Sequence, residues 1–257
     1  MKTGYYLVDP TGNITLLADT PVPAEKRAQT ARALMAAEKT AEQTGFIEGK
    51  TLNMAGGEFC GNATLSAAAV YCLKNSLSRA ELDLFVSGAS RPVHVSIEKE
   101  SEKEYSGTVD MPEPLEIKNI ELIIGGSAVT APAVDFGGIT HIILTDKAEK
   151  TESEKSIKIT CESLGAQSLG FIFTDGEKLT PLVYVTNPET LVWESSCASG
   201  TAAAGIYFAQ KNGGFFSGKF TEPGGDLEIR VRPGENGKPM PSLTGKVKII
   251  KKDSAEI

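Results

Sequence analysis

The chain has 257 residues, of which 40% are hydrophobic, so it can bury a substantial core as one large domain or two of average size. Lys and Arg number 26 against 33 Asp and Glu, which gives a formal net charge of −7 at pH 7. That charge argues against a nucleic-acid-binding protein or one that binds acidic membrane surfaces, and it favours a small-molecule partner.

The spacing of the cysteines and the length of the apolar runs indicate the cellular compartment of the protein. The four cysteines, Cys60, Cys72, Cys161 and Cys197, lack CxxC or Cys/His ligand spacing, so we expect no metal site. The opening MKTGYYLVDPTGN has no apolar signal-peptide core, and no apolar run approaches the roughly 18 residues of a membrane-spanning helix. We therefore expect a cytoplasmic protein with free thiols.

The first half of the chain predicts a hairpin, two helices and several strands. Turn residues in DPTGN, between YYLV and ITLLAD, predict the hairpin, and the helix formers of residues 24–43 predict the first helix. A strand and a glycine turn in KTLNMAGGEFC lead to Cys60, where a helix begins that runs to about Lys74. Alternating residues predict strands in LDLFVSG, RPVHVSIEKE and GTVDM. The face that the first helix is expected to bury consists of Ala31, Leu34, Met35 and Ala41.

The second half predicts the same kinds of element in a similar order. Strands are expected around ELIIGG, APAVDFG and THIIL, then a helix near EKSIKITCESLG and strands in GFIFTD and PLVYVT. Another helix follows Cys197, and EPGGDLEIRVRP and TGKVKIIKK predict the closing strands.

Two prolines mark the predicted domain boundary. Pro112 and Pro114 interrupt the strand pattern, so the predicted domains are residues 1–114 and 115–242. The C-terminal strand at about 243–257 is expected to pack with the first domain. Each domain then holds one helix that begins at a cysteine.

One local pattern occurs twice, as GEFCGNATLSAAAVYCL around Cys60 and as ESSCASGTAAAGIYFAQ around Cys197. The first amides of a helix have no intrahelical partner and carry partial positive charge, so they bind anions and lower the pKa of a thiol among them. Two such thiols facing one small anion could take a proton from one face of a carbon and return one to the other. The alternative is buried packing, but a packing site has no need to keep the cysteine in both copies.

The motifs resemble the diaminopimelate epimerase superfamily of cofactor-independent amino-acid racemases and epimerases. The matching elements are TGN ending at Asn13, GFIE ending at Glu48, CGN starting at Cys60, CASGTA after Ser196, His141 and PGGDLEI. The resemblance implies an α+β fold of two pseudo-symmetric domains, each a mixed or antiparallel sheet wrapped around a central helix. It places the active site in the cleft between the domains and requires no cofactor.

The resemblance also implies roles for individual residues. Cys60 and Cys197 would be the catalytic acid and base, and the partner would be a small molecule, a free amino acid. Its α-carboxylate would be held by the backbone amides of Gly61, Asn62, Ala198 and Ser199. The other substrate-binding residues that we expect are Asn13, Glu42, Glu48, His141 and Glu194.

Departures from the superfamily pattern narrow the range of substrates that we expect. Diaminopimelate epimerases bind a second carboxylate with two asparagines and an arginine, where this chain has Ile139, Ser168 and Ser195. A carboxylate buried without its cation costs several kcal/mol, so a substrate with a distal carboxylate is disfavoured. QTGFIE, GEFCGNAT and LVWESSCASGTA resemble the histidine racemases that supply D-histidine for opine-type metallophores. Glu42 and Glu48 flank an expected GFI turn and suit an imidazole, which donates hydrogen bonds and can become cationic.

Other functions stay open at this point. A diaminopimelate epimerase or a racemase of another amino acid is the alternative within the superfamily. A non-catalytic amino-acid-binding protein, or a thiol redox sensor in which the two cysteines form a disulfide, is the alternative of another class. Whether the protein forms a homodimer is also open.

Overall fold

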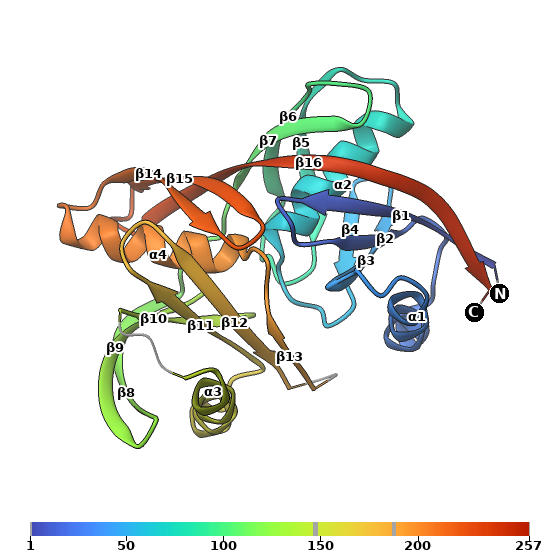
Figure 1. Cartoon of the computed structure of the whole chain (residues 1–257). Helices are drawn as coiled ribbons and strands as arrows, with labels where there is room; N and C mark the ends of the chain where they lie inside the picture. Colours follow the sequence, from blue (N-terminus) through green and yellow to red (C-terminus); the bar gives the residue numbers. More distant parts are fainter. Residues whose placement is uncertain (1, 146–148, 187–188, 257) are drawn as a thin grey trace. The chain divides into compact units, whose positions relative to one another are not determined.

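The computed structural model describes residues 2–145, 149–186 and 189–256 (Figure 1). Contacts within the chain divide it into two compact units, Met1–Asp110 with Leu243–Ile257, and Met111–Ser242. The C-terminal segment therefore folds with the N-terminal one, although the whole second unit lies between them in sequence.

The first unit is built on a sheet that closes on itself. Its strand order is β1-β2-β3-β4-β5-β6-β7-β16, and β16 also pairs antiparallel with β1. Closure gives β1 a paired strand on each side, β2 and β16. The hairpin of β1 and β2 is as expected from the turn residues between them. The bounds are β1 (Lys2–Pro10), β2 (Thr15–Ala18), β3 (Gln43–Glu48), β4 (Thr51–Met54), β5 (Arg79–Val86), β6 (Val93–Lys99), β7 (Glu104–Asp110) and β16 (Pro239–Glu256).

Helix α2 (Gly61–Lys74) begins at the first cysteine and is buried by these strands. It contacts β1, β2, β5, β6 and β7, and Figure 1 shows it among them. Its alanines and its Leu, Val and Cys side chains make it apolar around most of its circumference, as is typical of a helix enclosed by other elements. The predicted bounds of this helix, from Cys60 to about Lys74, are confirmed.

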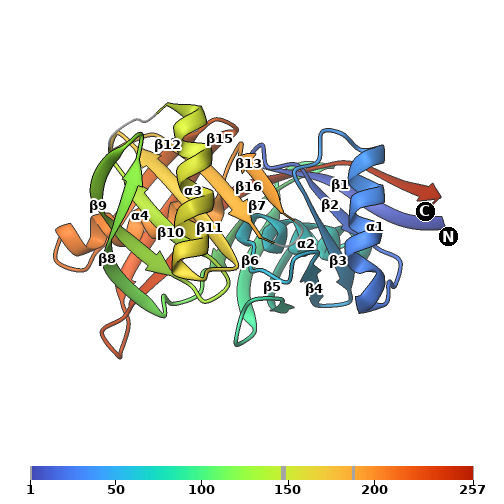
Figure 2. The same cartoon turned by 90° about the horizontal axis from the view of Figure 1, so that it is seen from below.

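Helix α1 (Ala24–Ala37) packs on β3, and the two lie side by side in both views (Figures 1 and 2). It ends well before residue 43, so Ala41 reaches the same apolar cluster from the following loop and not from the helix. The expected GFI turn is wrong, because Gly45 lies within β3. A Cβ at Gly45 would lie 2.8 Å from Leu52 Cδ1, so this glycine serves close packing inside the sheet.

The second unit holds a six-stranded sheet of order β13-β12-β11-β10-β9-β8 and the β14–β15 hairpin, in which β15 is the sheet neighbour of β16. Helix α3 (Lys150–Leu164) links β10 to the parallel β11 and packs on the sheet (Figure 2). Helix α4 (Ala198–Lys211) contacts β9, β10 and β11 as well as β14 and β15. The bounds are β8 (Glu116–Ile124), β9 (Ser127–Asp135), β10 (Thr140–Leu144), β11 (Ser168–Thr174), β12 (Leu179–Val185), β13 (Thr190–Trp193), β14 (Phe216–Glu222) and β15 (Gly225–Pro233).

Two strands of this unit, β13 and β14, were not expected from the sequence. β13 is only four residues long, and β14 reads FSGKFTE, in which a glycine and a lysine weaken the strand signal. Trp193 at the end of β13 stacks on Phe173 and donates from Nε1 to Glu154 Oε1 at 2.8 Å, so it packs against α3. Cys72 and Cys161 are buried core residues, as expected.

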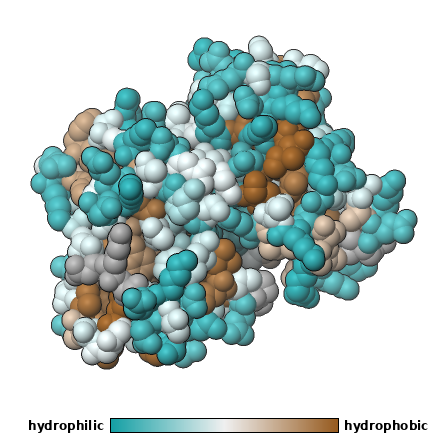
Figure 3. Space-filling model, in the orientation of Figure 1, coloured by the Kyte–Doolittle hydropathy of each residue, from teal (hydrophilic) through white to brown (hydrophobic). Residues whose placement is uncertain are grey.

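The surface is mainly polar. In Figure 3 most of the visible face is teal or white, and brown is confined to separate patches. The most exposed large apolar side chains are dispersed, with Phe85 on β5, Leu115 just before β8, Ile123 on β8 and Ile159 on α3. Within the described ranges, every helix is too short or too polar to cross a membrane.

A partly buried carboxylate joins three elements of the first unit and gives a stability prediction. Glu38 Oε1, at the end of α1, accepts from Lys251 Nζ on β16 and from Tyr5 Oη on β1, each at 2.5 Å. We expect Glu38→Gln to lower the free energy of unfolding by about 1–2 kcal/mol at pH 7, measured by urea unfolding. Glu116→Gln, which breaks an exposed pair with Lys118, is the control and should cost under about 0.5 kcal/mol.

The same contact predicts a pH dependence. The hydrogen bonds from Lys251 and Tyr5 hold the pKa of Glu38 below its usual value. The stabilisation is therefore complete above the unfolded-state pKa of about 4.3 and is lost as the pH falls through the lower folded-state pKa. The stability difference between the wild type and Glu38→Gln should shrink between pH 7 and pH 3. A constant difference, or equal losses for the two Gln variants at pH 7, would contradict this account.

Candidate active site

The first cysteine caps the buried helix α2. Cys60 has an extended backbone (φ −134°, ψ 113°), and its Sγ accepts a hydrogen bond from the Ala63 amide at 3.4 Å. Thr64 Oγ1 donates to the Cys60 carbonyl at 2.7 Å. Cys60 is only half-buried. A sulfur that accepts an amide hydrogen bond at a helix N-terminus is stabilised as a thiolate.

The loop before Cys60 is held by the turn that follows β5. Ser87 Oγ accepts from the Met54 amide and donates to the Glu58 carbonyl. Gly88 has φ +74°, and a Cβ there would lie 2.3 Å from the backbone nitrogen of Phe59. Only glycine fits this close approach, which sets the position of the chain immediately before the cysteine.

A polar cluster adjoins the start of α2. Asn13 Nδ2 donates to Glu42 Oε2 at 2.6 Å, and Asn62 Nδ2 donates to Asn13 Oδ1 at 3.2 Å. Gln43 Nε2 also donates to Asn13 Oδ1, at 2.5 Å, and to Thr15 Oγ1 at 2.8 Å. Asn13 and Asn62 are almost fully buried. The structure thus brings Asn13, Glu42 and Asn62 together, and it adds Gln43, which sequence reasoning missed because it was assigned to a helix.

Glu48 is not part of this cluster. It ends β3, whereas Gln43 begins it, and at about 3.3 Å per residue the two are roughly 16 Å apart. Glu48 is exposed, and together with Arg27 and Phe46 it lines a surface hollow away from the cluster around Asn13. The structure therefore separates Glu48 from Glu42, although the sequence suggested that both flank one turn.

The second cysteine caps α4 with nearly the same backbone conformation as Cys60. Cys197 has φ −133° and ψ 101°, but it is 6% exposed and its sulfur accepts no capping hydrogen bond from the helix. Its amide instead donates to Glu222 Oε2 at 2.6 Å. Gly200 allows Ile172 of β11 to pack against the first turn of α4, because a Cβ at Gly200 would lie 2.4 Å from Ile172 Cδ1. The amides of the first residues of a helix have no intrahelical acceptor. In α2 these residues are Gly61 and Asn62, and in α4 they are Ala198 and Ser199.

A buried histidine reaches Cys197 through a serine. His141 Nε2 lies 2.8 Å from Ser199 Oγ, which lies 3.6 Å from Cys197 Sγ. His141 is fully buried, and burial lowers its pKa to about 3, so the ring is neutral. Its Nδ1 has no hydrogen-bond partner among the described residues. Because a buried N–H without an acceptor is costly, the proton belongs on Nε2, which donates to Ser199 and leaves the serine hydroxyl free to donate to Cys197.

The electrostatic surroundings of Cys197 raise its pKa well above the usual value. Burial is the largest cause, and the carboxyls of Glu194 and Glu222 add to it. The hydrogen bond from Ser199 acts in the opposite direction. The sequence left open which cysteine is the thiolate, because the two helix starts look alike, and the surroundings of Cys197 disfavour a thiolate there.

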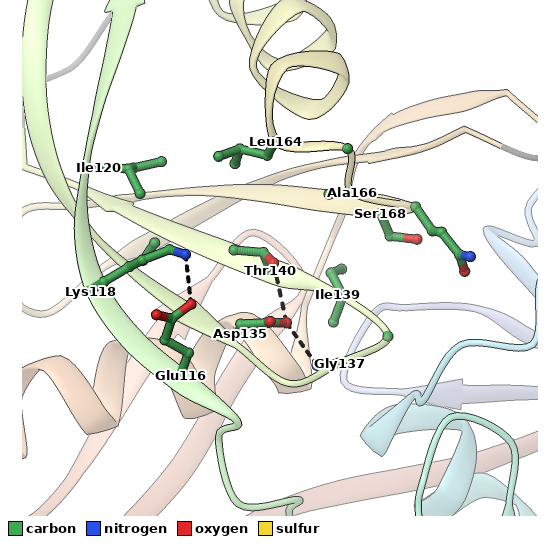
Figure 4. A pocket seen from close by; sticks show the side chains of 14 residues that line it. Glu116, Lys118, Ile120, Asp135, Gly137, Ile139, Thr140, Leu164, Ala166 and Ser168 are labelled. Atoms are coloured by element: carbon green, nitrogen blue, oxygen red, sulfur yellow. Dashed lines mark hydrogen bonds and ion pairs between the residues drawn. The ribbon is translucent and has the colours of Figure 1, made fainter.

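A cavity of about 370 Å³ lies at the edge of the second unit between β8, β9, β10 and the end of α3 (Figure 4). Ile139 and Ser168, which the resemblance to diaminopimelate epimerases led us to expect in place of two asparagines, both line it. In Figure 4 Lys118 is paired with Glu116, and Asp135 accepts from Thr140 and from the Gly137 amide. Lys118, the cation that lines this cavity, thus already forms an ion pair with the carboxylate of Glu116.

Comparison with protein families gives a match over nearly the whole chain. Residues 2–255 match the family model described as "Histidine racemase CntK N-terminal domain". A histidine racemase of Fusobacterium nucleatum subsp. nucleatum is 30% identical in an alignment 239 residues long that covers 89% of this chain and 89% of that protein. A histidine racemase of Staphylococcus aureus is 29% identical and covers 86% of this chain and 85% of its own length.

Solved structures share the fold at much lower identity. A phenazine biosynthesis protein of the PhzF family from Enterococcus faecalis superposes with a TM-score of 0.64 at 17% identity, covering 100% of both chains. A hydroxyproline epimerase from Agrobacterium vitis, with bound trans-4-OH-L-proline, gives a TM-score of 0.67 at 8% identity, covering 99% of this chain and 92% of that one. These neighbours support a mixed, sheet-dominated α+β fold with a barrel-like sheet.

The packing around His141 gives a direct test. A Cβ at Gly170 would lie 2.2 Å from His141 Nδ1, so Gly170→Ala must displace the ring or the strand. We expect this change to lower the free energy of unfolding by about 1–3 kcal/mol in urea. Gly4→Ala is the matched strand control, because its nearest new contact is 3.5 Å away. Equal stability of the two variants would show that His141 is not held by this close contact.

Proposed function

The chain belongs to the histidine racemase family, and from that premise we propose that it interconverts L- and D-histidine without a cofactor. The observation that carries the proposal is the pair of cysteine caps. Cys60 and Cys197 begin the two most buried helices with backbone angles that differ by no more than about 12°. Such a repeated arrangement is what a two-base proton transfer needs.

The proposed mechanism uses the helix starts and the thiols together. The α-carboxylate accepts hydrogen bonds from amides of Gly61, Asn62, Ala198 and Ser199, whose partial positive charge stabilises the carbanion. One cysteine, as thiolate, takes the α-proton, so a C–H bond breaks and an S–H bond forms. The other cysteine, as thiol, delivers its proton to the opposite face. In the reverse reaction the two exchange roles.

The cluster around Asn13 supports an imidazole as the side chain. Glu42 places a carboxylate oxygen 2.6 Å from Asn13 Nδ2, next to the residues that begin α2. A carboxylate accepts an imidazole N–H and attracts the cationic form. Ile139 and Ser168 offer no charge to a second carboxylate, which disfavours diaminopimelate. A binding cleft between two pseudo-symmetric domains and a cytoplasmic location remain predictions.

The cysteines are tested by isosteric replacement. Cys60→Ser and Cys197→Ser should each lower the racemisation rate of histidine by at least about 10³-fold, because a hydroxyl is much harder to ionise than a thiol. Chiral chromatography of both enantiomers measures the rate, and circular dichroism checks the fold. Cys72→Ser, in the core of α2, is the control that should stay active. Racemisation near the wild-type rate in either single variant would exclude the two-base mechanism.

The substrate side chain is tested at Glu42. Glu42→Gln keeps the size of the side chain but removes its charge, so we expect kcat/KM for histidine to fall about 10–100-fold, mainly through KM. Glu48→Gln, at the far end of β3, is the matched control and should leave both parameters within about twofold. A larger effect of Glu48→Gln than of Glu42→Gln would overturn the assignment. Parallel assays with meso-diaminopimelate and other amino acids distinguish histidine from the alternatives.

A further inference from the structure

We propose that Glu222 is a positioning residue that keeps the proton on Cys197, so that the resting enzyme carries its thiolate at Cys60. The proposal rests on the proposed two-cysteine function and assigns unequal roles to two cysteines whose sequence motifs look alike. It concerns a carboxyl that neither the motif pattern nor the proposed substrate contacts use.

Glu222 is built into the start of α4 from a separate element. It is the last residue of β14, it is 4% exposed, and it lies 25 positions beyond Cys197 in sequence. Its Oε2 accepts the Cys197 amide at 2.6 Å, and its Oε1 contacts Thr201 Oγ1, one turn into the helix. The carboxyl therefore occupies the end of the helix that would otherwise stabilise an anion at Cys197.

The corresponding position of α2 is arranged differently. There the sulfur of Cys60 itself accepts a helix amide, that of Ala63 at 3.4 Å. At α4 the sulfur of Cys197 receives no helix amide, and the carboxyl of Glu222 takes the cap position. Because the backbone angles of the two cysteines are nearly the same, the difference lies in what surrounds each sulfur.

The hydroxyl of Thr201 is a second hydrogen-bond partner of Glu222. Thr201 Oγ1 lies 2.9 Å from the Cys197 carbonyl and also contacts Glu222 Oε1. Thr201 and the Cys197 amide each donate a hydrogen bond to the carboxyl, and both bonds favour its ionised form. Burial acts in the opposite direction and is the larger effect, so the pKa of Glu222 is raised to about 8.

The effect on Cys197 follows from the charges around it. Among the described residues, the ionisable groups against this thiol are Glu194, Glu222 and, through Ser199, the neutral His141. When Glu222 loses its proton above about pH 8, a second negative charge at Cys197 becomes costly. The thiol of Cys197 is thus kept protonated over the range in which other thiols ionise.

The test is a titration of Cys197 that needs no turnover. In a Cys60→Ser background, thiolate absorbance at 240 nm is followed against pH, and the signal of the Cys60→Ser/Cys197→Ser variant is subtracted to remove Cys72, Cys161 and the tyrosines. Adding Glu222→Gln, which keeps the shape but removes the charge, should lower the midpoint of Cys197 by at least about one pH unit. Glu222→Asp, which keeps the charge, should restore a higher midpoint. Glu228→Gln, an exposed change on β15, is the control and should not move it.

A second measurement leaves Glu222 unchanged, in case the Gln variant does not fold. With ¹³C-labelled glutamate, one carboxyl resonance of the Cys60→Ser protein should titrate near pH 8, before Cys197 ionises. An unchanged Cys197 midpoint in Glu222→Gln, or no glutamate carboxyl that titrates above about pH 6, would overturn the proposal. Neither measurement uses histidine, so either result is independent of whether the protein racemises it.

Discussion

The amide groups at the start of an enclosed helix are the constraint on which this site depends. Helices α2 and α4 are buried on most of their surface, so their first amides lie away from bulk water and need acceptors. In both, the residue at this position is a cysteine with an extended backbone. The fold therefore places two thiols where partial positive charge collects, and an anionic substrate group can be bound by the same amides.

The same constraint is met by different groups at the two helix starts. At Cys60 the sulfur accepts the amide of Ala63, and a polar cluster built on Asn13 lies beside it. At Cys197 the acceptor is the carboxyl of Glu222, and a neutral His141 reaches the sulfur through Ser199. Cys60 is thus half-buried with a helix amide on its sulfur, whereas Cys197 is buried beside carboxyls that raise the pKa of its thiol. Two-base proton transfer requires that the pair be in opposite protonation states.

The sequence predicted the parts of the site that depend on local chemistry. The two cysteine-led helices, the opening hairpin and the neighbourhood of Asn13 and Asn62 follow from turn residues, helix formers and motif order. It did not predict that Gly45 lies inside a strand, because glycine there serves packing against Leu52, which only the paired strands reveal. Nor could it predict that Glu222 lies at the start of α4. The β14–β15 hairpin that carries this residue packs on α4 through tertiary contacts, which a local motif does not encode. The contacts that distinguish the two thiols are long-range, whereas the motifs that carry them are local.

The most direct test of two-base racemisation is the fate of the α-hydrogen in D2O. L-histidine is incubated with reduced enzyme, and the α-proton of each separated enantiomer is measured by proton NMR and mass spectrometry at low conversion. The mechanism predicts that the D-histidine formed carries deuterium while the remaining L-histidine keeps its proton, because different cysteines remove and deliver it. Deuterium in both enantiomers from the start, or protium retained in the product, would show that a single base exchanges the hydrogen and would contradict the assignment of Cys60 and Cys197 as a pair.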